Sequence, residues 1–369
     1  MIVIVAVLAA GFVGYQYVKS KMDKIQTTDL NKEKVETNER KEETKEASKG
    51  YTTIALFGLD NRKTGYYDRG NSDVIMIMSM NNDTKELQMV SVYRDTYLNI
   101  QGDQDSFRKA NSAYAYGGPE QAISMLNKNL DLDIDNYVTF DFETVADAID
   151  ILGGVDIEIE SQEELNYLNK YIDHTDGILG TSTKHVYNTG KQTLSGVQAV
   201  AYGRIRYTSG SDFRRAERHR LVLTQLFKKA KKADLAELNS LMDEIFPKIK
   251  TDLTQKQILS MVTTVLDYDL KDSRGFPFDK RSTKLSQSVG WVDVPCDLLT
   301  NVTELHKYLY SNEKYEPSST VEEYSDTIVN NTGFTKEKAE DDRFSEIDDF
   351  DGKNDTDEKD DVSGTVVDE

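Results

Sequence analysis

Short runs of apolar and β-branched residues, bounded by turn residues, occur at five places along the chain. They cover residues 52–59, 74–80, 87–92, 137–142 and 155–159. Runs of this length and composition are typical of strands buried in a sheet. We therefore expect a strand at each of these five places.

Apolar residues recur at helical spacing between and after these runs. Residues 119–130 begin with Pro119, which favours a first helical turn, and carry Ile123, Leu126 and Leu130 at helical spacing. The remaining helical patterns cover residues 142–152, 221–232, 235–245 and 255–266. Strands that alternate with helices predict an α/β fold, which we expect to be a three-layer α/β/α arrangement around a central mixed β-sheet.

Residues 1–18 are predicted to be a transmembrane anchor that precedes this domain. Residues 2–18 contain no charged side chain, and as a helix they would span roughly 26 Å, at the short end of the range for a membrane segment. A signal peptide would begin with basic residues, but only Met1 precedes the apolar run. A core helix at the extreme N-terminus would not be apolar on every face. We therefore favour the anchor over both alternatives.

The charges beside the predicted anchor leave its orientation open. Lys19, Lys21 and Lys24 follow it, and the positive-inside rule taken literally would place the rest of the chain in the cytoplasm. Alternatively, the true start lies upstream and includes a basic cytoplasmic tail, so that the rest of the chain lies outside the membrane.

Two segments are too polar to form a core of their own. Residues 19–50 are rich in Lys, Glu, Thr and Asn, and are predicted to be a solvated stalk. Residues 316–369 carry 19 acidic and five basic side chains, and are predicted to be a disordered acidic tail. The predicted folded domain is therefore residues 51–315.

Charge and cysteine content exclude some classes of protein. The 369 residues include 45 Lys and Arg and 65 Asp and Glu, a net charge of −20, of which the predicted tail contributes −14. The rest of the chain is nearly balanced and has no basic stripe, which argues against a nucleic-acid-binding protein. Cys296 is the only cysteine, so a disulfide framework and a multi-cysteine metal site are excluded.

Arginines are the most informative charged residues. The chain has 14, and six of them lie within 17 residues: Arg204, Arg206, Arg214, Arg215, Arg218 and Arg220. The guanidinium group is a planar fork of donors that suits phosphate, so several forks in one place suggest a polyanionic ligand. The alternative is a solvated helix face whose arginines pair with Asp212 and Glu217.

The local pattern predicts how these side chains are presented. If residues 202–207 form a strand, Arg204 and Arg206 point to one face of it. If a helix begins near Asp212, one side of that helix carries Arg215, Arg218 and His219.

Carboxylates follow or open the predicted strands. Asp60 follows the first strand, Asp73 opens the second, and Asp95 follows the third. Ligands of open α/β sheets collect at the carboxyl ends of strands, and Mg2+ commonly takes one or two carboxylates together with substrate phosphates. The alternative is that these aspartates are turn formers or helix caps.

Seven stretches of the chain, in order, resemble the LytR-CpsA-Psr (LCP) family of Gram-positive cell envelopes. They are LFGLDNR at 56–62, RGNSD at 69–73, VSVYRDT at 90–96, KANSAYAYGG at 109–118, LGGVD at 152–156, LSGVQAVAYGRIR at 194–206 and SDFRRAERH at 211–219. The resemblance covers residues 51–230 and extends less distinctly to 315.

The resemblance implies an activity, partners and a location. Family members transfer a phosphorylated glycopolymer, such as a wall teichoic acid or a capsular polysaccharide, from a polyprenyl diphosphate carrier to peptidoglycan. The implied cofactor is Mg2+, with Mn2+ as a substitute. The implied location is the cell membrane, with a single anchor and the catalytic domain outside. No nucleic acid is involved.

The resemblance also implies roles for individual residues. The family's metal-binding aspartates match Asp60 and Asp73. The residues expected at the substrate diphosphate are Arg69, Arg94, Lys109, Arg204, Arg206, Arg215, Arg218 and His219. Arg94 is also expected to be catalytic, and Asp95 or Asp212 is the candidate that orients or deprotonates the acceptor hydroxyl.

The chain departs from the family pattern at four positions, and other functions stay open. Asn71 stands where the family has Arg, and Arg214 stands where it has Gly. Tyr93 replaces a Pro, and His219 replaces a Gln. One alternative is a polyprenyl diphosphate pyrophosphatase that uses water as the acceptor. Another is a non-catalytic protein that binds the lipid-linked polymer or acts as an envelope scaffold. A transcriptional regulator is disfavoured, because the sequence shows no helix-turn-helix motif.

Overall fold

The computed structural model describes residues 19–21, 23–28, 30–60, 65–102, 104–205, 211–264 and 267–339. For residues 104, 211–213, 259, 262 and 263 it describes the backbone only. The predicted anchor at 1–18, residues 340–369 of the predicted tail, and Arg206 lie outside the described residues. Among the helices that are described, none has the length and apolar character needed to cross a membrane.

A mixed β-sheet forms the centre of the described part of the chain, as the sequence predicts. Seven strands pair in the order β1, β10, β7, β2, β3, β4, β11. Neighbours β2–β3, β3–β4 and β7–β10 are antiparallel, whereas β2–β7, β4–β11 and β1–β10 are parallel. The strands are β1 (Gln26–Thr27), β2 (Tyr51–Leu59), β3 (Ser72–Asn81), β4 (Glu86–Val92), β7 (Tyr137–Asp141), β10 (Lys250–Thr251) and β11 (Asp269–Phe276).

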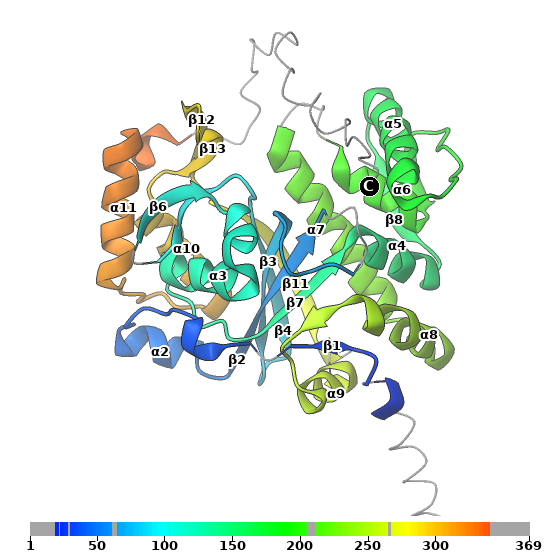
Figure 1. Ribbon diagram of the computed structural model, residues 1–369, viewed down its shortest axis with the longest axis horizontal. Coiled ribbons are helices and arrows are strands. Elements are labelled where there is room, and N and C mark those ends of the chain that lie inside the picture. Colours follow the sequence, from blue (N-terminus) through cyan, green and yellow to red (C-terminus); the bar gives the residue numbers. More distant parts are fainter. Residues whose placement is uncertain are drawn as a thin grey trace, which may run out of the picture.

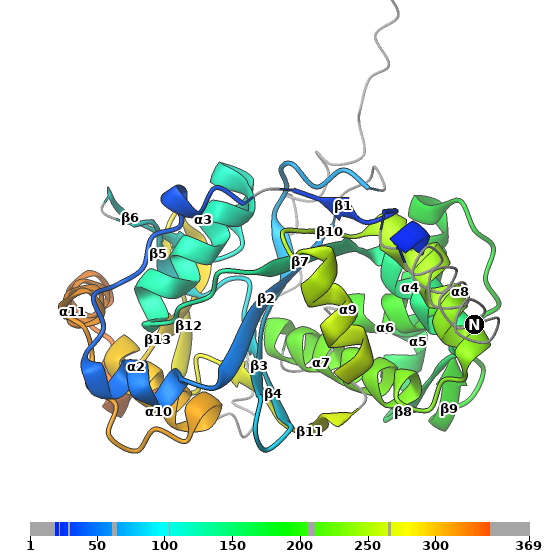
Figure 2. The same cartoon turned by 90° about the horizontal axis from the view of Figure 1, so that it is seen from below.

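Helices cover both sides of this sheet (Figures 1 and 2). One side carries α2 (Glu42–Ser48), α3 (Ser112–Leu130), α10 (Leu298–Tyr310) and α11 (Ser319–Thr332). The other side carries α4 (Phe142–Ile151), α5 (Gln162–Leu179), α6 (Gly196–Arg204), α7 (Ser211–Ala230), α8 (Leu235–Ile245) and α9 (Gln255–Thr264). Three two-stranded antiparallel sheets also occur in the described part: β5 (Tyr97–Gln101) with β6 (Gln104–Lys109), β8 (Val155–Ile159) with β9 (Gly190–Leu194), which α5 separates in the sequence, and β12 (Lys280–Ser286) with β13 (Gly290–Pro295).

The apolar runs form strands because they bury their side chains in two main clusters. One cluster joins the sheet to α3, α10 and α11, and includes Phe57, Ile77 and Leu126. The second cluster lies among α4, α5, α6 and the β8–β9 strand pair. In β8 the odd-numbered residues are buried and the even-numbered ones are exposed, as the period of two in a strand requires.

The strand considered for residues 202–207 does not form over its described part. These residues instead form the end of α6, which stops at Arg204, and Ile205 follows in an extended conformation. A capping box between Ser195 and Gln198 fixes the start of this helix, because each side chain satisfies a backbone N–H of the first turn. The helix thus runs through a segment whose alternating residues resembled a strand.

The polar segments on either side of the predicted domain also differ from expectation. Leu30 and Thr44, in the predicted stalk, are buried against the domain. Helix α11, in the predicted disordered tail, buries Val321 and Ile328 in the main cluster. The described domain therefore extends beyond 51–315 at both ends.

The carboxylate of Asp131 joins a residue of the predicted stalk to residues just before α11. Asp131, at the left-handed C-cap of α3, is fully buried. Its Oδ1 accepts hydrogen bonds from Asn38 Nδ2 at 2.5 Å and Ser318 Oγ at 2.6 Å. Its Oδ2 accepts from Tyr315 Oη at 2.5 Å and from the Ser318 backbone N–H at 2.8 Å. Four donors satisfy the buried charge, as a buried carboxylate requires.

Candidate functional site

Sheet register brings the predicted carboxylates to one edge of the sheet. Leu59, at the end of β2, pairs with Ser72, at the start of β3, so Asp60 and Asp73 adjoin at the same edge. In β4, Val92 pairs with Ile75 of β3, which places Arg94 and Asp95 at this edge as well. The β strands thus gather residues that are up to 35 positions apart in the sequence.

Asp73, Arg94, Asp95 and Lys109 form a continuous chain of opposite charges. Arg94 Nη1 donates to Asp73 Oδ1 at 2.6 Å. On its other side Arg94 Nε lies 3.5 Å from Asp95 Oδ1, and Lys109 Nζ lies 3.3 Å from the same oxygen. The Asp73 side chain is only 9% exposed, and limited solvent access strengthens such charge interactions. Arg94 is thereby held in a fixed orientation between two carboxylates.

Arg204 reaches the same edge from the end of α6. Its Nη2 lies 3.6 Å from Asp60 Oδ2, and its Nη1 donates to Thr175 Oγ1 on α5 at 3.2 Å. The guanidinium carbon also lies 5.1 Å from the centre of the Phe142 ring, within the range of a cation–π contact. A cation in the last turn of a helix is favoured by the helix dipole. Arg204 is therefore both positioned and partly shielded from solvent.

Helix α7 begins at Ser211, where the sequence predicts a helix near Asp212, and brings Arg215 and His219 to the cluster. Arg215 is buried, and the buried Nε2 of His219 has no hydrogen-bond partner within the described residues. Burial, followed by the positive charge of Arg215, lowers the pKa of His219 to about 3, and Asp73 opposes this shift. His219 is therefore a neutral side chain at neutral pH.

Close packing of α6 on α7 explains one glycine of the motif. A Cβ atom on Gly203 would lie 2.9 Å from Cδ2 of His219, closer than carbon atoms normally approach. Gly203 therefore lets the His219 ring lie directly against α6. Any larger residue at position 203 would displace either the ring or Arg204, the next residue.

Arg218 has a different environment from its neighbours on α7. Its Nε and Nη2 both donate to Glu164 Oε1 on α5, at 3.1 and 2.9 Å, and its Nη1 donates to the Ile205 carbonyl at 3.2 Å. The two side chains are 5% and 6% exposed. Arg218 also lies over the Tyr202 ring. These contacts indicate that Arg218 joins α7 to α5, and sequence reasoning had grouped it with the phosphate ligands.

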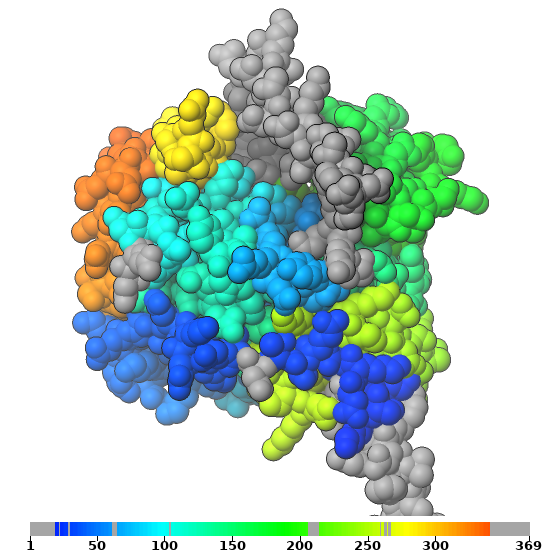
Figure 3. All heavy atoms as spheres, viewed as in Figure 1, coloured from blue at the N-terminus to red at the C-terminus, as the bar shows by residue number. Residues whose placement is uncertain are grey.

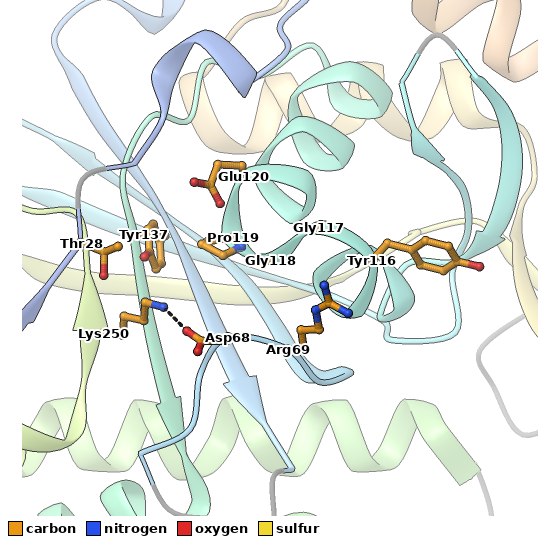
Figure 4. A pocket seen from close by; sticks show the side chains of 10 residues that line it. All are labelled: Thr28, Asp68, Arg69, Tyr116, Gly117, Gly118, Pro119, Glu120, Tyr137 and Lys250. Carbon is orange, nitrogen blue, oxygen red and sulfur yellow. Dashed lines mark hydrogen bonds and ion pairs between the residues drawn. The ribbon is translucent and has the colours of Figure 1, made fainter.

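Arg69 lines a separate cavity of about 310 Å3. Figure 4 shows it near the Gly117–Gly118 kink of α3 and next to Asp68, which pairs with Lys250. Gly118 has a φ of +68°, a conformation that favours glycine, and this kink opens the helix toward the cavity. Arg94, Lys109 and Arg204 are not among the described residues that line this cavity.

Two predicted residues are described in part or not at all. The backbone of Asp212 lies in the first turn of α7, and its side chain is outside the described part. Arg206 is not among the described residues. The supporting residues Glu164, Thr175 and Phe142 were not predicted, because no local pattern links them to arginines that are 29 to 62 positions away.

Carboxylates at the sheet edge suit the chemistry of a divalent cation. Asp60 and Asp73 offer carboxylate oxygens, which a hard cation prefers. Among the described residues, no group of three or more His, Cys, Asp or Glu side chains gathers as a metal site. A cation bound here would complete its coordination with water or ligand oxygens, as Mg2+ usually does.

Comparison with known proteins identifies the family. The model of the LytR_cpsA_psr family matches residues 12–275. The chain belongs to this family. It is 31% identical over 245 residues to the polyisoprenyl-teichoic acid–peptidoglycan teichoic acid transferase TagU of Bacillus cereus, covering 66% of this chain and 74% of that one. A TagU of Enterococcus faecalis is 27% identical over 258 residues, covering 69% of this chain and 76% of that one.

Solved structures share the fold. The structure of TagT bound to LI-WTA has a TM-score of 0.58 and 23% identity, covering 77% of this chain and 98% of that one. The structure of the LytR-CPS2A-psr family protein YwtF (TagT) with bound octaprenyl pyrophosphate lipid has a TM-score of 0.55 and 21% identity, covering 77% and 98%. TagV of Bacillus subtilis has a TM-score of 0.56 and 22% identity, covering 73% and 99%.

Proposed function

We propose that this protein transfers a phosphorylated glycopolymer from a polyprenyl diphosphate carrier to peptidoglycan. Family membership supports the proposal, as do relatives named teichoic acid transferases. The observation that carries it is the cluster of Arg94, Lys109, Arg204 and Arg215 with Asp60, Asp73 and Asp95 at one edge of the sheet. Phosphoryl transfer is mainly a matter of positioning a phosphate and neutralising its charge, and this cluster supplies what both tasks need.

The arginines would bind the diphosphate. A diphosphate diester carries two negative charges, and guanidinium groups bind such oxygens with two parallel hydrogen bonds. Arg94 is held between two carboxylates and Arg204 between Thr175 and Asp60, so little side-chain entropy is lost when they bind. Lys109, Arg206 and Arg215 would add charge.

The transfer step requires an acceptor hydroxyl and a proton acceptor. The hydroxyl oxygen of a peptidoglycan sugar would attack the phosphorus atom that bears the glycopolymer. A new P–O bond forms, the P–O bond to the polyprenyl phosphate breaks, and that phosphate leaves. The hydroxyl proton passes to a carboxylate. Asp95 is our first candidate because it lies beside Arg94 and Lys109, and Asp212 is the second.

Asp60 and Asp73 would hold Mg2+, or Mn2+ in its place. When bound, the cation would neutralise charge on the diphosphate. In the described structure each of these carboxylates lies beside an arginine, so the same oxygens that orient Arg94 and Arg204 would be shared with the cation. We further propose that residues 1–18 anchor the chain in the cell membrane and that the domain lies outside, where peptidoglycan is found.

Reconstituted transfer tests the proposal. The full chain is mixed with a lipid-linked, radiolabelled glycopolymer and purified peptidoglycan, with and without Mg2+, and label attached to peptidoglycan is counted. We expect Arg94→Ala and Asp73→Asn to lower the transfer rate about 100-fold or more, because each removes charge stabilisation from the transition state. Arg214→Ala is the matched control, since Arg214 pairs with Glu160 and Glu217 on the surface.

Three outcomes would contradict the proposal. Full transfer by both variants would exclude this cluster as the site. Release of labelled polymer into solution at the same rate with and without peptidoglycan would indicate a pyrophosphatase. Binding of the lipid without any turnover would indicate a non-catalytic binding protein.

A further inference from the structure

Arg94 and Asp95 occupy the two central positions of a tight turn. The Thr96 backbone N–H donates to the Tyr93 carbonyl at 3.0 Å, and the Thr96 hydroxyl donates to the same carbonyl at 2.7 Å. A backbone bond between the first and fourth residues is characteristic of a β-turn. The orientation of both site residues therefore depends on how the two corners of the turn, Tyr93 and Thr96, are held.

The β12–β13 hairpin holds the Thr96 corner. Thr96 is fully buried and forms a parallel β-bridge with Asp293 of β13. The Asp293 backbone N–H donates to the Asp95 carbonyl at 2.9 Å. Figure 3 shows this hairpin, in yellow, directly beside the cyan part of the chain. Backbone contacts with a neighbouring strand thus fix one corner of the turn.

Strand β11 holds the Tyr93 corner. The Tyr93 backbone N–H donates to the Phe276 carbonyl at 2.9 Å. A Cβ atom on Gly275 would lie 2.5 Å from Cζ of Tyr93, closer than carbon atoms of different residues approach. The ring therefore lies directly against the backbone of β11, and the absence of a side chain at position 275 leaves room for it.

A buried lysine contacts the same ring. Lys280, at the start of β12, is only 1% exposed, and its Nζ lies 5.1 Å from the centre of the Tyr93 ring. This distance is within the range of a cation–π contact, which is stronger where water is excluded. Tyr93 itself is 6% exposed. The ring is therefore held by β11 and by the start of β12, and has little freedom to move.

These contacts explain how the chain accommodates Tyr93 where the family has Pro. Proline fixes φ and lacks a backbone N–H, so it could not donate to the Phe276 carbonyl. In this chain the hydrogen bond to Phe276 and the packing of the ring hold the corner instead. The departure from the family pattern therefore replaces one constraint on the turn by another.

We propose that Tyr93 is a positioning residue for the transfer reaction. Together with Gly275 and Lys280 it forms a clamp, the Tyr93 clamp, that fixes the turn carrying Arg94 and Asp95. A misplacement of about 1 Å in groups of this kind can lower a rate about 100-fold. The inference rests on the proposed function for the roles of Arg94 and Asp95.

A double-mutant cycle tests the Tyr93 clamp in the full chain. Gly275→Ala places a methyl group against the Tyr93 ring, whereas in Tyr93→Pro the ring is gone and the same methyl group has room. We expect Gly275→Ala to lower the kcat of transfer about tenfold in the wild-type background, and less than about twofold in the Tyr93→Pro background. The KM for peptidoglycan should stay unchanged. An equal loss of kcat in both backgrounds would overturn the proposal.

Further variants make the test independent of proline. Tyr93→Phe keeps the ring over Lys280 and should retain most of the kcat, whereas Tyr93→Leu keeps the N–H but loses the ring and should lower kcat about tenfold. Lys280→Met removes the buried charge and should lower kcat about threefold. Lys284→Met is its matched control, because Lys284 is exposed on the same strand.

Folding of each variant is checked by circular dichroism at the assay temperature, so that a lower kcat does not reflect unfolding. A folded Tyr93→Leu variant with the kcat of the wild-type chain would overturn the proposal. So would a folded Lys280→Met variant that matches its control.

Lipid binding distinguishes this inference from the proposed function. Each protein of the cycle is titrated with a short polyprenyl diphosphate by calorimetry. If the wild-type chain binds the lipid but transfers nothing, the proposed function is refuted, and a Kd that Gly275→Ala raises only when Tyr93 is present still supports the clamp. If the wild-type chain transfers polymer and Gly275→Ala does so at an unchanged rate, the clamp is refuted and the function stands.

Discussion

The buried pair of Arg218 and Glu164 allows a direct test of whether Arg218 is a structural residue or a phosphate ligand. The perturbation is Glu164→Ala. It removes the oxygen that accepts from both Nε and Nη2 of Arg218, while the hydrogen bond from Nη1 to the Ile205 carbonyl stays. Both side chains are almost fully buried, so water cannot readily replace the lost carboxylate.

The structure sets the size of the effect. Removing one partner of a buried ion pair costs about 3–5 kcal/mol, because the other charge stays buried without compensation. For a domain of this size each kcal/mol lowers the Tm by roughly 2–4 °C, so we expect a decrease of about 6–20 °C. The matched control is Arg214→Ala on the same helix. Its guanidinium group is partly exposed and lies 3.5 Å or more from its acidic partners, so we expect a change of at most about 0.5 kcal/mol.

The assay is urea and thermal unfolding followed by far-ultraviolet circular dichroism. A double variant, Glu164→Leu with Arg218→Met, completes it. Replacing both members of a buried pair by apolar residues is often neutral, so the double variant should recover most of the stability and should still bind a polyprenyl diphosphate. Two results would refute the structural role: Glu164→Ala as stable as the control, or a stable double variant that no longer binds the lipid.

Two further predictions concern the charged side chains at the sheet edge and their neighbours. The pKa of His219 is about 3 in the folded protein and about 6.5 in an unfolded chain. Between these two pH values the unfolded state binds more protons than the folded state. The free energy of unfolding therefore falls as the pH decreases through this window, by up to ~1.4 kcal/mol per pH unit. His219→Gln should flatten the urea-derived stability between pH 7.5 and 5.5; the same slope in this variant and in the wild-type protein would contradict the assignment. Arg204→Ala should weaken binding of a short polyprenyl diphosphate at least tenfold, whereas Arg69→Ala, in the separate cavity, should weaken it less than threefold; the reverse order would place Arg69 in the site.

The elements that the sequence predicted are those whose pattern is set by burial on a simple period. Strands β2, β3 and β4 were predicted from unbroken apolar runs, and the structure buries these runs between two layers of helices. The sequence could not show that Arg204 ends a helix, because residues 202–207 alternate like a strand and the deciding signal, the capping box at Ser195 and Gln198, lies one helix length upstream.

Helix α11 was missed for another reason. Its apolar residues Val321, Tyr324 and Ile328 follow helical spacing, with Ser318 as N-cap and Gly333 after the C-terminus, which are recognisable start and stop signals. The acidic composition of the surrounding segment obscured this pattern. The β12–β13 hairpin was missed because its outward face is basic and polar, and only Val292 and Val294 show the period of two.

For the site, sequence reasoning found charged residues but not their partners. Asp73, Arg94, Asp95 and Lys109 were predicted, and the structure joins them in one chain of contacts. Residues from α5, such as Glu164 and Thr175, decide which arginine is available to a ligand and which one only stabilises the fold. Only tertiary structure reveals that difference.

The Asp131 carboxylate makes the two terminal segments of the domain depend on each other. Asn38, from the segment before β2, and Ser318, the N-cap of α11, bind the same oxygen. Loss of this carboxylate would therefore loosen both segments together, although they lie 280 positions apart in the sequence and, in the described part of the chain, neither packs on the arginines of the site.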